Sequence, residues 1–166
     1  MKRVVVVLGT RPEAIKLAPL ISEFRSKYTH HIELVVVSTG QHYEMLRQSL
    51  EAFSQNIDVS LDLMIDNQDP SNLFILAFDA ISTQLRIMNP VDMVVVQGDT
   101  TTTLAAAIAA GYQGIDLAHV EAGLRTYNLK NPHPEEINRK VVDSFSKLNV
   151  RPHNLRERST FKRGCM

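Results

Sequence analysis

Runs of apolar residues recur along the chain and predict buried strands. Three runs rich in β-branched side chains cover residues 3–8, 34–38 and 92–97, and a shorter one covers 116–120. The apolar residues are continuous and do not alternate with polar ones, which is typical of a strand covered on both faces in a parallel sheet. We therefore expect these four segments to form the centre of such a sheet.

The segments between the strands have the apolar spacing of helices. Apolar residues recur at intervals of three and four over residues 13–24, 45–53, 73–88 and 102–110. Strands that alternate with helices at this spacing form right-handed βαβ units. The sequence therefore predicts an α/β fold: one Rossmann-like domain over residues 1–166, with an open parallel sheet and helices on both of its faces.

Polar and ionisable residues follow each of the four predicted strands. They occupy residues 9–13, 39–42, 98–101 and 121–125. In parallel sheets of this class, ligands bind beyond the carboxyl ends of the strands, where loops lead into helices. A ligand site is thus expected at this edge of the sheet.

Composition excludes several classes of protein. The formal net charge is zero, so neither nucleic acid nor a membrane surface is expected as a partner. No run approaches the roughly 18 apolar residues of a membrane span, and we expect a cytoplasmic location. Cys165 is the only cysteine, which excludes a disulfide framework within one chain.

Residues 151–166 carry five Lys and Arg against one Glu, and this basic segment is either a solvated helix or a contact for an anion or partner.

Residues 10–13, Thr-Arg-Pro-Glu, match a capping box, with Thr10 as N-cap and Glu13 returning to the backbone. Arg11 has no capping role there, because a cation opposes the dipole at a helix N-terminus. Arg11 is either an ordinary surface cation or a contact for a bound anion, and Lys16 can reach the same space. The loop lacks the GxGxxG pattern of dinucleotide-binding proteins.

Two carboxylates follow strands, and each has a structural and a chemical interpretation. Asp99 either caps the Ala-rich helix after it or acts as a general acid or base. Glu121 is a poor N-cap, so it either pairs with Arg125 or has a chemical role. His119 is expected to be a packed histidine or one at the sheet edge.

A further helix is expected to open near residues 132–139, where two prolines fix its entry. Glu135 and Arg139 stand four residues apart in it and can form an ion pair on one helix face. Gln41 and His42 follow the second strand. The spacing of the six histidines shows no zinc pattern, and we expect neither a metal nor a cofactor.

Five segments together resemble the non-hydrolysing UDP-N-acetylglucosamine 2-epimerases, and the likeness extends over residues 2–164. The segments are GTRPEAIKLAPL (9–20), TGQH (39–42), QGDTTTTLA (97–105), HVEAGLRT (119–126) and PHPEEINR (132–139). Two departures stand near the end of the domain: Arg-Pro-His-Asn at 151–154 replaces the family's usual Ala-Pro-Thr-Glu, and His133 replaces Phe or Trp.

The resemblance implies one half of a GT-B arrangement, in which two Rossmann-like domains enclose the substrate. Most UDP contacts and a further catalytic histidine come from the family's C-terminal domain, which is not among these residues. The residues that the resemblance assigns to the site from this half are Arg11, Lys16, Asp99, Glu121, Glu135 and Arg139, and Gln41 and His42 are further candidates for substrate binding.

The family reaction inverts C2 of the GlcNAc unit and gives UDP-ManNAc. It eliminates UDP to form a 2-acetamidoglucal and then adds UDP back, without NAD and without a required metal. The resemblance implies acid and base roles for Asp99 and Glu121, with Glu135 as the third candidate. Arg11, Lys16 and Arg139 would stabilise the departing diphosphate.

Three interpretations of the whole chain follow from the resemblance. In the first, the chain is the N-terminal half of an epimerase, inactive alone and binding a UDP-sugar weakly or not at all. In the second, it is a regulator that associates with a full-length epimerase in a mixed dimer. The family dimerises largely through this domain, so either a homodimer of this chain or that heterodimer is expected. In the third, it is the product of a decayed gene.

Overall fold

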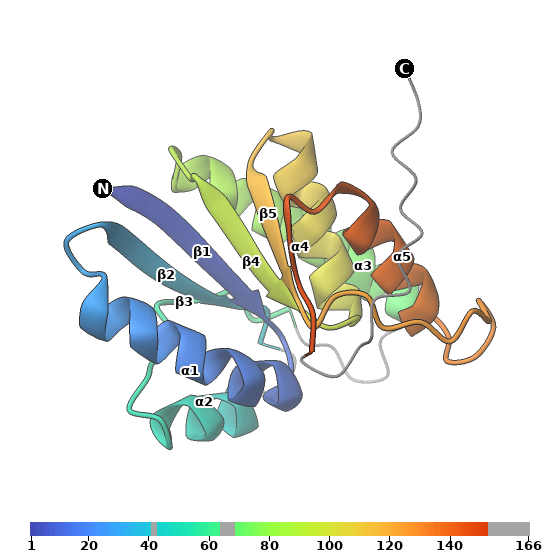
Figure 1. Ribbon diagram of the computed structural model, residues 1–166, viewed down its shortest axis with the longest axis horizontal. Coiled ribbons are helices and arrows are strands. Elements are labelled where there is room, and N and C mark those ends of the chain that lie inside the picture. The colour runs from blue at the N-terminus through green and yellow to red at the C-terminus, as the bar shows by residue number, and fades with distance from the viewer. Residues whose placement is uncertain (41–42, 64–68, 153–166) are drawn as a thin grey trace.

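A six-stranded parallel sheet forms the centre of the fold (Figure 1). The computed structural model describes residues 1–40, 43–63 and 69–152. The sheet order is β3-β2-β1-β4-β5-β6, the order of a doubly wound fold. The strands are β1 (Lys2–Leu8), β2 (Ile32–Ser38), β3 (Val59–Ser60), β4 (Met93–Gln97), β5 (Asp116–Val120) and β6 (Leu148–Val150); the helices are α1 (Arg11–Lys27), α2 (Tyr43–Glu51), α3 (Pro70–Ile87), α4 (Thr101–Tyr112) and α5 (Glu135–Phe145).

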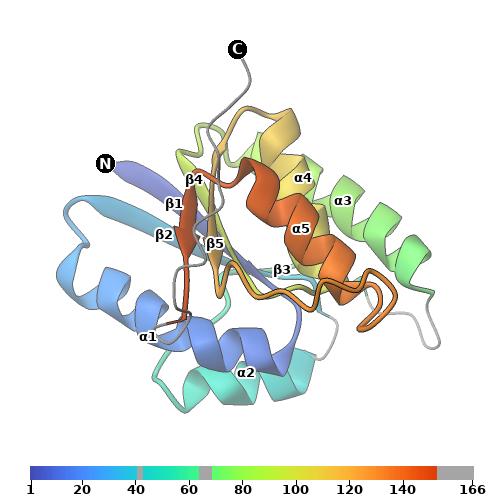
Figure 2. The ribbon, with the colours of Figure 1, turned by 45° about the vertical axis from the view of Figure 1, so that its right-hand side comes forward.

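Helices cover both faces of the sheet, as the sequence predicts (Figures 1 and 2). Successive side chains of β1 point to opposite faces, so Val5 and Val7 pack with α3 and α4. Val4, Val6 and Leu8 pack against α1 and α2. Because the central strands are apolar toward both cores, their sequences show no alternation. The expected α/β class is confirmed.

All four predicted strands and all four predicted helices are present, with ends shifted by a few residues. The helix expected near 132–139 is α5, which begins at Glu135. β3 was not predicted, because two residues are too short to show a period. It pairs with β2 through Val37 and Val59 and lies at the edge of the sheet.

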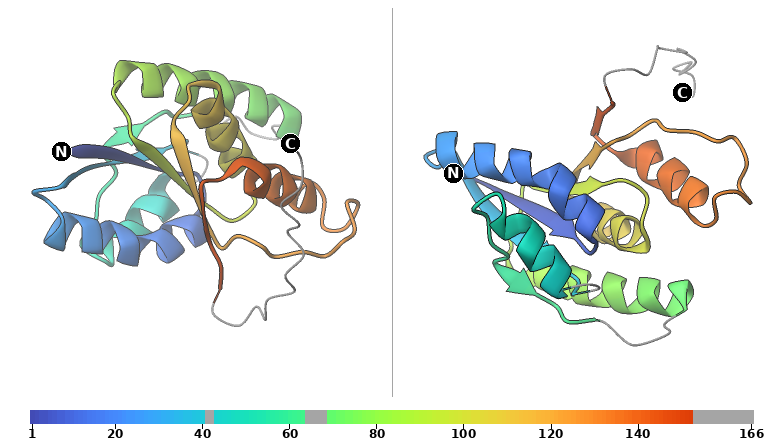
Figure 3. Two further views of the ribbon diagram at one scale, coloured as in Figure 1. Left: turned by 45° about the horizontal axis from the view of Figure 1, so that its top comes forward. Right: turned by 90° about the horizontal axis from the view of Figure 1, so that it is seen from below.

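The long connection between β5 and α5 extends past the N-terminal end of α5 before the chain turns back into the helix (Figure 3). Its first residues lie beside the carboxyl end of β4, since Glu121 and Leu124 line one pocket with Gln97 and Gly98. Within the described residues, no helix is long and apolar enough to cross a membrane. The cytoplasmic location stays a prediction.

Candidate active site

A pocket of about 210 Å³ lies at the carboxyl edge of the sheet. Four segments far apart in the sequence meet there: the start of α1, the end of β4, the loop after β5 and the first turns of α5. Its lining residues are Thr10, Pro12, Glu13, Lys16, Gln97, Gly98, Asp99, Thr100, Glu121, Leu124 and Arg139. Two carboxylates and two cations of the predicted site thus share one cavity.

Asp99 is held in this pocket from α5. Arg139 Nε donates to Asp99 Oδ2 at 2.6 Å, and Asn138 Nδ2 donates to the Asp99 carbonyl oxygen at 2.8 Å. The cap of α4 is Thr100, whose hydroxyl accepts from the Thr103 amide at 3.1 Å. Of the two interpretations of Asp99, capping is therefore the wrong one. Its carboxylate faces the pocket, next to a cation.

Glu121 lies across the same pocket and contacts a different cation. Its Oε2 accepts hydrogen bonds from Lys16 Nζ and Gln97 Nε2. The expected alternative, a pair with Arg125, is wrong, because Arg125 donates to Asp143 at 2.5 Å. Glu121 also adopts a left-handed backbone with φ of 66°, which is unfavourable for a residue with a Cβ. Such strain recurs at functional sites.

The capping box fixes the start of α1 and thereby the place of Lys16. Thr10 is the N-cap residue, and Glu13 Oε2 accepts from the amides of Gly9 and Thr10, each at 2.7 Å. The Glu13 carboxylate is 2% exposed. Its Oε1 accepts from the Thr100 hydroxyl at 2.6 Å, which ties the start of α1 to the start of α4. The role of Glu13 is therefore to fix the loop geometry.

Arg139 is oriented by a second, buried carboxylate. Its Nη1 donates to Glu136 Oε2 at 3.1 Å, and Glu136 is fully buried. Burial of Glu136 opposes ionisation, but hydrogen bonds from Thr126 and Tyr127 together with the charge of Arg139 outweigh it, so the pKa of Glu136 lies below its ordinary value. The expected pair between Glu135 and Arg139 is wrong, because Arg139 turns toward the sheet, where Glu136 and Asp99 meet it.

The remaining predicted residues lie outside this pocket. Glu135 is the first residue of α5, and its Oε2 is buried without a hydrogen-bond partner among the described residues. Arg11 is exposed and lines a neighbouring pocket of about 310 Å³ between α1 and α2. Gln41 and His42 lie outside the described residues, as does the basic segment from residue 153 on.

Sequence reasoning missed several residues that hold the site in place. Gln97, Glu136, Asn138 and Asp143 all contact predicted site residues or their loops. A signal for two of them exists in the sequence. Glu136, Arg139 and Asp143 stand at i, i+3 and i+7, so three charged residues share one face of a helix that must pack on the sheet.

Comparison with known proteins identifies the family. Residues 25–165 match the family model described as UDP-N-acetylglucosamine 2-epimerase. The chain is 45% identical to the UDP-N-acetylglucosamine 2-epimerase of Neisseria meningitidis serogroup A over 150 residues, which are 90% of this chain and 40% of that protein. It is 41% identical to the Campylobacter jejuni enzyme of the same name over 152 residues, 92% of this chain and 39% of that protein. The chain thus spans about two-fifths of these relatives.

Solved structures agree with the sequence matches. The fold is similar to the N. meningitidis UDP-GlcNAc 2-epimerase bound to UDP-GlcNAc, with a TM-score of 0.80 and 46% identity over 87% of this chain and 39% of that chain. It is also similar to the Methanocaldococcus jannaschii enzyme in complex with UDP-GlcNAc and UDP, with a TM-score of 0.78 and 35% identity over 87% of this chain and 38% of that chain. The chain belongs to the UDP-N-acetylglucosamine 2-epimerase family and corresponds to its N-terminal Rossmann-like domain.

Proposed function

We propose that this chain supplies the N-terminal half of an active site that interconverts UDP-GlcNAc and UDP-ManNAc. The observation that carries the proposal is the pairing of two carboxylates with two cations in one pocket, Asp99 with Arg139 and Glu121 with Lys16. Relatives with similar folds bind UDP-GlcNAc. The proposed site lies where doubly wound folds bind ligands.

The two ion pairs suit an elimination that expels a diphosphate. A carboxylate removes the C2 proton, the C2–H electron pair forms the C1–C2 double bond, and the bond from C1 to the UDP oxygen breaks. Addition of UDP to C1 with return of a proton to the other face of C2 completes the inversion. Two acid–base groups on opposite sides of the sugar ring are therefore needed, and we assign Asp99 and Glu121 to them. Glu135 stays the third candidate.

The cations have a second role in this proposal. A diphosphate that enters the pocket competes with Asp99 and Glu121 for Arg139 and Lys16, because phosphate oxygens pair strongly with guanidinium and ammonium groups. Substrate binding would thus free both carboxylates for proton transfer. Arg139 keeps its place meanwhile, since the buried Glu136 holds it. Arg11, which lines the neighbouring pocket, is proposed to contact a more distant part of the substrate, and Gln41 and His42 stay candidates for substrate binding.

The test measures UDP-GlcNAc conversion by the purified chain, alone and together with the separately produced C-terminal half of the C. jejuni relative. We expect turnover only in the mixture, with deuterium appearing at C2 of the product in D₂O. Asp99→Asn and Glu121→Gln should each lower the rate by a factor of about 10² to 10⁴. Glu23→Gln on the outer face of α1 is the matched control and should leave the rate unchanged. Turnover by the chain alone, or full activity of Asp99→Asn, would refute the proposal.

The second candidate function, association with a full-length epimerase in a mixed dimer, is favoured by an apolar surface on α3, α4 and α5. Tyr112 is 84% exposed, and its ring lies edge-on to Phe78 at 6.1 Å between centroids. Ile108 and Phe145 line a shallow pocket beside it. We expect a co-eluting complex and an altered epimerase rate on mixing. Tyr112→Ser should weaken the complex, whereas Tyr28→Ser on the opposite side of the sheet should not.

A further inference from the structure

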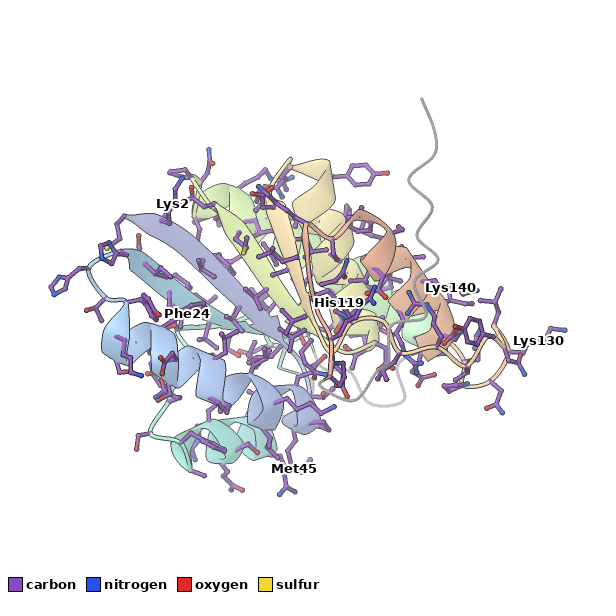
Figure 4. All side chains as sticks on the ribbon, in the orientation of Figure 1. Lys2, Phe24, Met45, His119, Lys130 and Lys140 are labelled. Carbon is purple, nitrogen blue, oxygen red and sulfur yellow. The ribbon has the colours of Figure 1, made fainter. Side chains whose placement is uncertain are left out.

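A buried cluster behind the pocket joins the two loops that carry Asp99 and Glu121. His119 on β5 is fully buried on the side of the sheet that α5 covers (Figure 4). Its Nδ1 lies 2.5 Å from Asp143 Oδ1, and its Nε2 lies 2.7 Å from the carbonyl oxygen of Gly98. Neither His119 nor Asp143 lines the pocket, so the proposed chemistry does not use their side chains directly.

The hydrogen bonds fix where the protons of the ring must be. A carbonyl oxygen only accepts, so Nε2 has to donate to Gly98. Burial of Asp143 opposes ionisation, but hydrogen bonds from His119 and Arg125 outweigh it and hold the pKa of Asp143 below its ordinary value. An ionised carboxylate also only accepts, which requires a second N–H at Nδ1. Two further donors, the Gly123 amide and Arg125, contact the same carboxylate, so the hydrogen-bond geometry also calls for an ionised Asp143 and an N–H at each ring nitrogen.

The other oxygen of Asp143 holds the second loop. Asp143 Oδ2 accepts from the Gly123 amide at 3.0 Å and from Arg125 Nη2 at 2.5 Å. Gly123 follows Glu121 by two residues, and Gly98 directly precedes Asp99. One charged pair thus connects the chain on both sides of the pocket. The same helix, α5, also carries Arg139, one turn earlier, and Arg139 contacts the Asp99 carboxylate.

We infer that His119 and Asp143 form a buried ion pair that sets the position of the Asp99 loop relative to the Glu121 loop. They are positioning residues, because neither reaches the pocket in which the substrate is proposed to bind. The inferred effect on catalysis rests on the proposed function. The inferred effect on the position of the two loops concerns this chain alone, and it can be tested without turnover.

The first measurement needs no substitution. Nitrogen-15 shifts of the imidazole rings, assigned by through-bond correlation to the backbone, should show two protonated nitrogens for His119 at pH 7.5. A ring with one unprotonated nitrogen would overturn the ion pair. Because this experiment uses the unaltered chain, it decides the point even where a variant fails to fold.

The second measurement follows the two loops in Asp143→Asn. The Gly123 amide reports on the Glu121 loop. The Arg139 Nε–H, which donates to Asp99, reports on the Asp99 loop. We expect exchange of both protons with solvent to speed up at least about tenfold. Ile81→Val, in the core between α3 and the sheet, is the control for a general loss of stability and should change neither proton by more than about twofold. Unchanged exchange in folded Asp143→Asn would overturn the positioning role.

The third measurement uses the mixture of this chain with the C-terminal half of the C. jejuni relative. There, Asp143→Asn should lower kcat at least about tenfold while KM changes less than about twofold, since the proposed substrate contacts stay intact. Asp143→Glu, which keeps the charge, should recover part of the loss. If the unaltered mixture shows no turnover, the proposed function fails while the ring and exchange measurements still decide the inference. A rise in KM with kcat unchanged would overturn the positioning role.

Discussion

Replacing Glu13 with glutamine tests whether the buried carboxylate fixes the loop at the edge of the sheet. Glu13 Oε2 accepts from the amides of Gly9 and Thr10 at 2.7 Å. Glu13 Oε1 accepts from the hydroxyls of Thr100 at 2.6 Å and Thr103 at 3.2 Å. Glutamine has nearly the same shape but replaces one of the two oxygens with an NH₂ group, which cannot accept.

The size of the effect follows from these four hydrogen bonds. The backbone amides cannot rotate, so the NH₂ group must face the hydroxyls, which then accept from it instead of donating to a charged oxygen. The two amide bonds and the Thr100 bond remain, but all three lose the charge of their partner. A hydrogen bond to a charged group contributes about 1 kcal/mol more than a neutral one, and a neutral bond contributes about 1 kcal/mol. We therefore expect Glu13→Gln to lower the free energy of unfolding by about 3 kcal/mol.

Equilibrium unfolding in urea, followed by far-ultraviolet circular dichroism because the chain has no tryptophan, measures this change. With an m-value of about 2 kcal/mol/M, the midpoint should fall by about 1.5 M. Glu23→Gln makes the same chemical change on the same helix, where Glu23 pairs with Lys27 in solvent, and should cost less than about 0.5 kcal/mol. A midpoint for Glu13→Gln equal to that of Glu23→Gln would refute the reasoning.

Three further predictions concern the backbone and the buried carboxylates. Because Glu121 has positive φ, Glu121→Gly should be about 1 kcal/mol more stable than Glu121→Ala in urea unfolding, whereas the same pair at helical, exposed Gln48 should show the reverse order. Gly9→Ala should lower the thermal midpoint by several degrees, since a Cβ there would lie 2.5 Å from a buried threonine hydroxyl. The pKa values of Glu136 and Asp143 are lowered in the folded chain, so their contribution to the free energy of unfolding should be complete above about pH 5 and fall as both groups are protonated in acid. Glu136→Gln should flatten this dependence on pH in urea unfolding, and an unchanged profile would contradict the prediction.

The pattern of residues along the chain was enough to predict the layers of the fold. Strand and helix positions follow from local periodicity, since a strand buried on both faces has no room for polar residues. Helices α1 and α4 begin within two residues of their expected starts. Thr10 caps α1 as predicted, and Thr100 caps α4 in place of Asp99. Segments too short to have a period, such as β3, could not be predicted in this way.

The candidate site was predictable only as a set of residues. The carboxyl ends of parallel strands meet at one edge, so the sequence alone indicated that Asp99, Glu121 and Lys16 lie near each other. The pairs that sequence neighbours allowed, Glu121 with Arg125 and Glu135 with Arg139, are both wrong, because residues on other elements take their places.

The sequence by itself therefore determined the α/β architecture, the edge of the sheet where a ligand site is expected and the family likeness. Only the tertiary structure decided which cation meets which carboxylate, and that Asp143, His119 and Glu136 hold the loops from behind. The physical reason is that hydrophobic periodicity is a local property, read along one element at a time. A buried charge, by contrast, takes whichever partner the packing of separate elements brings within hydrogen-bond distance.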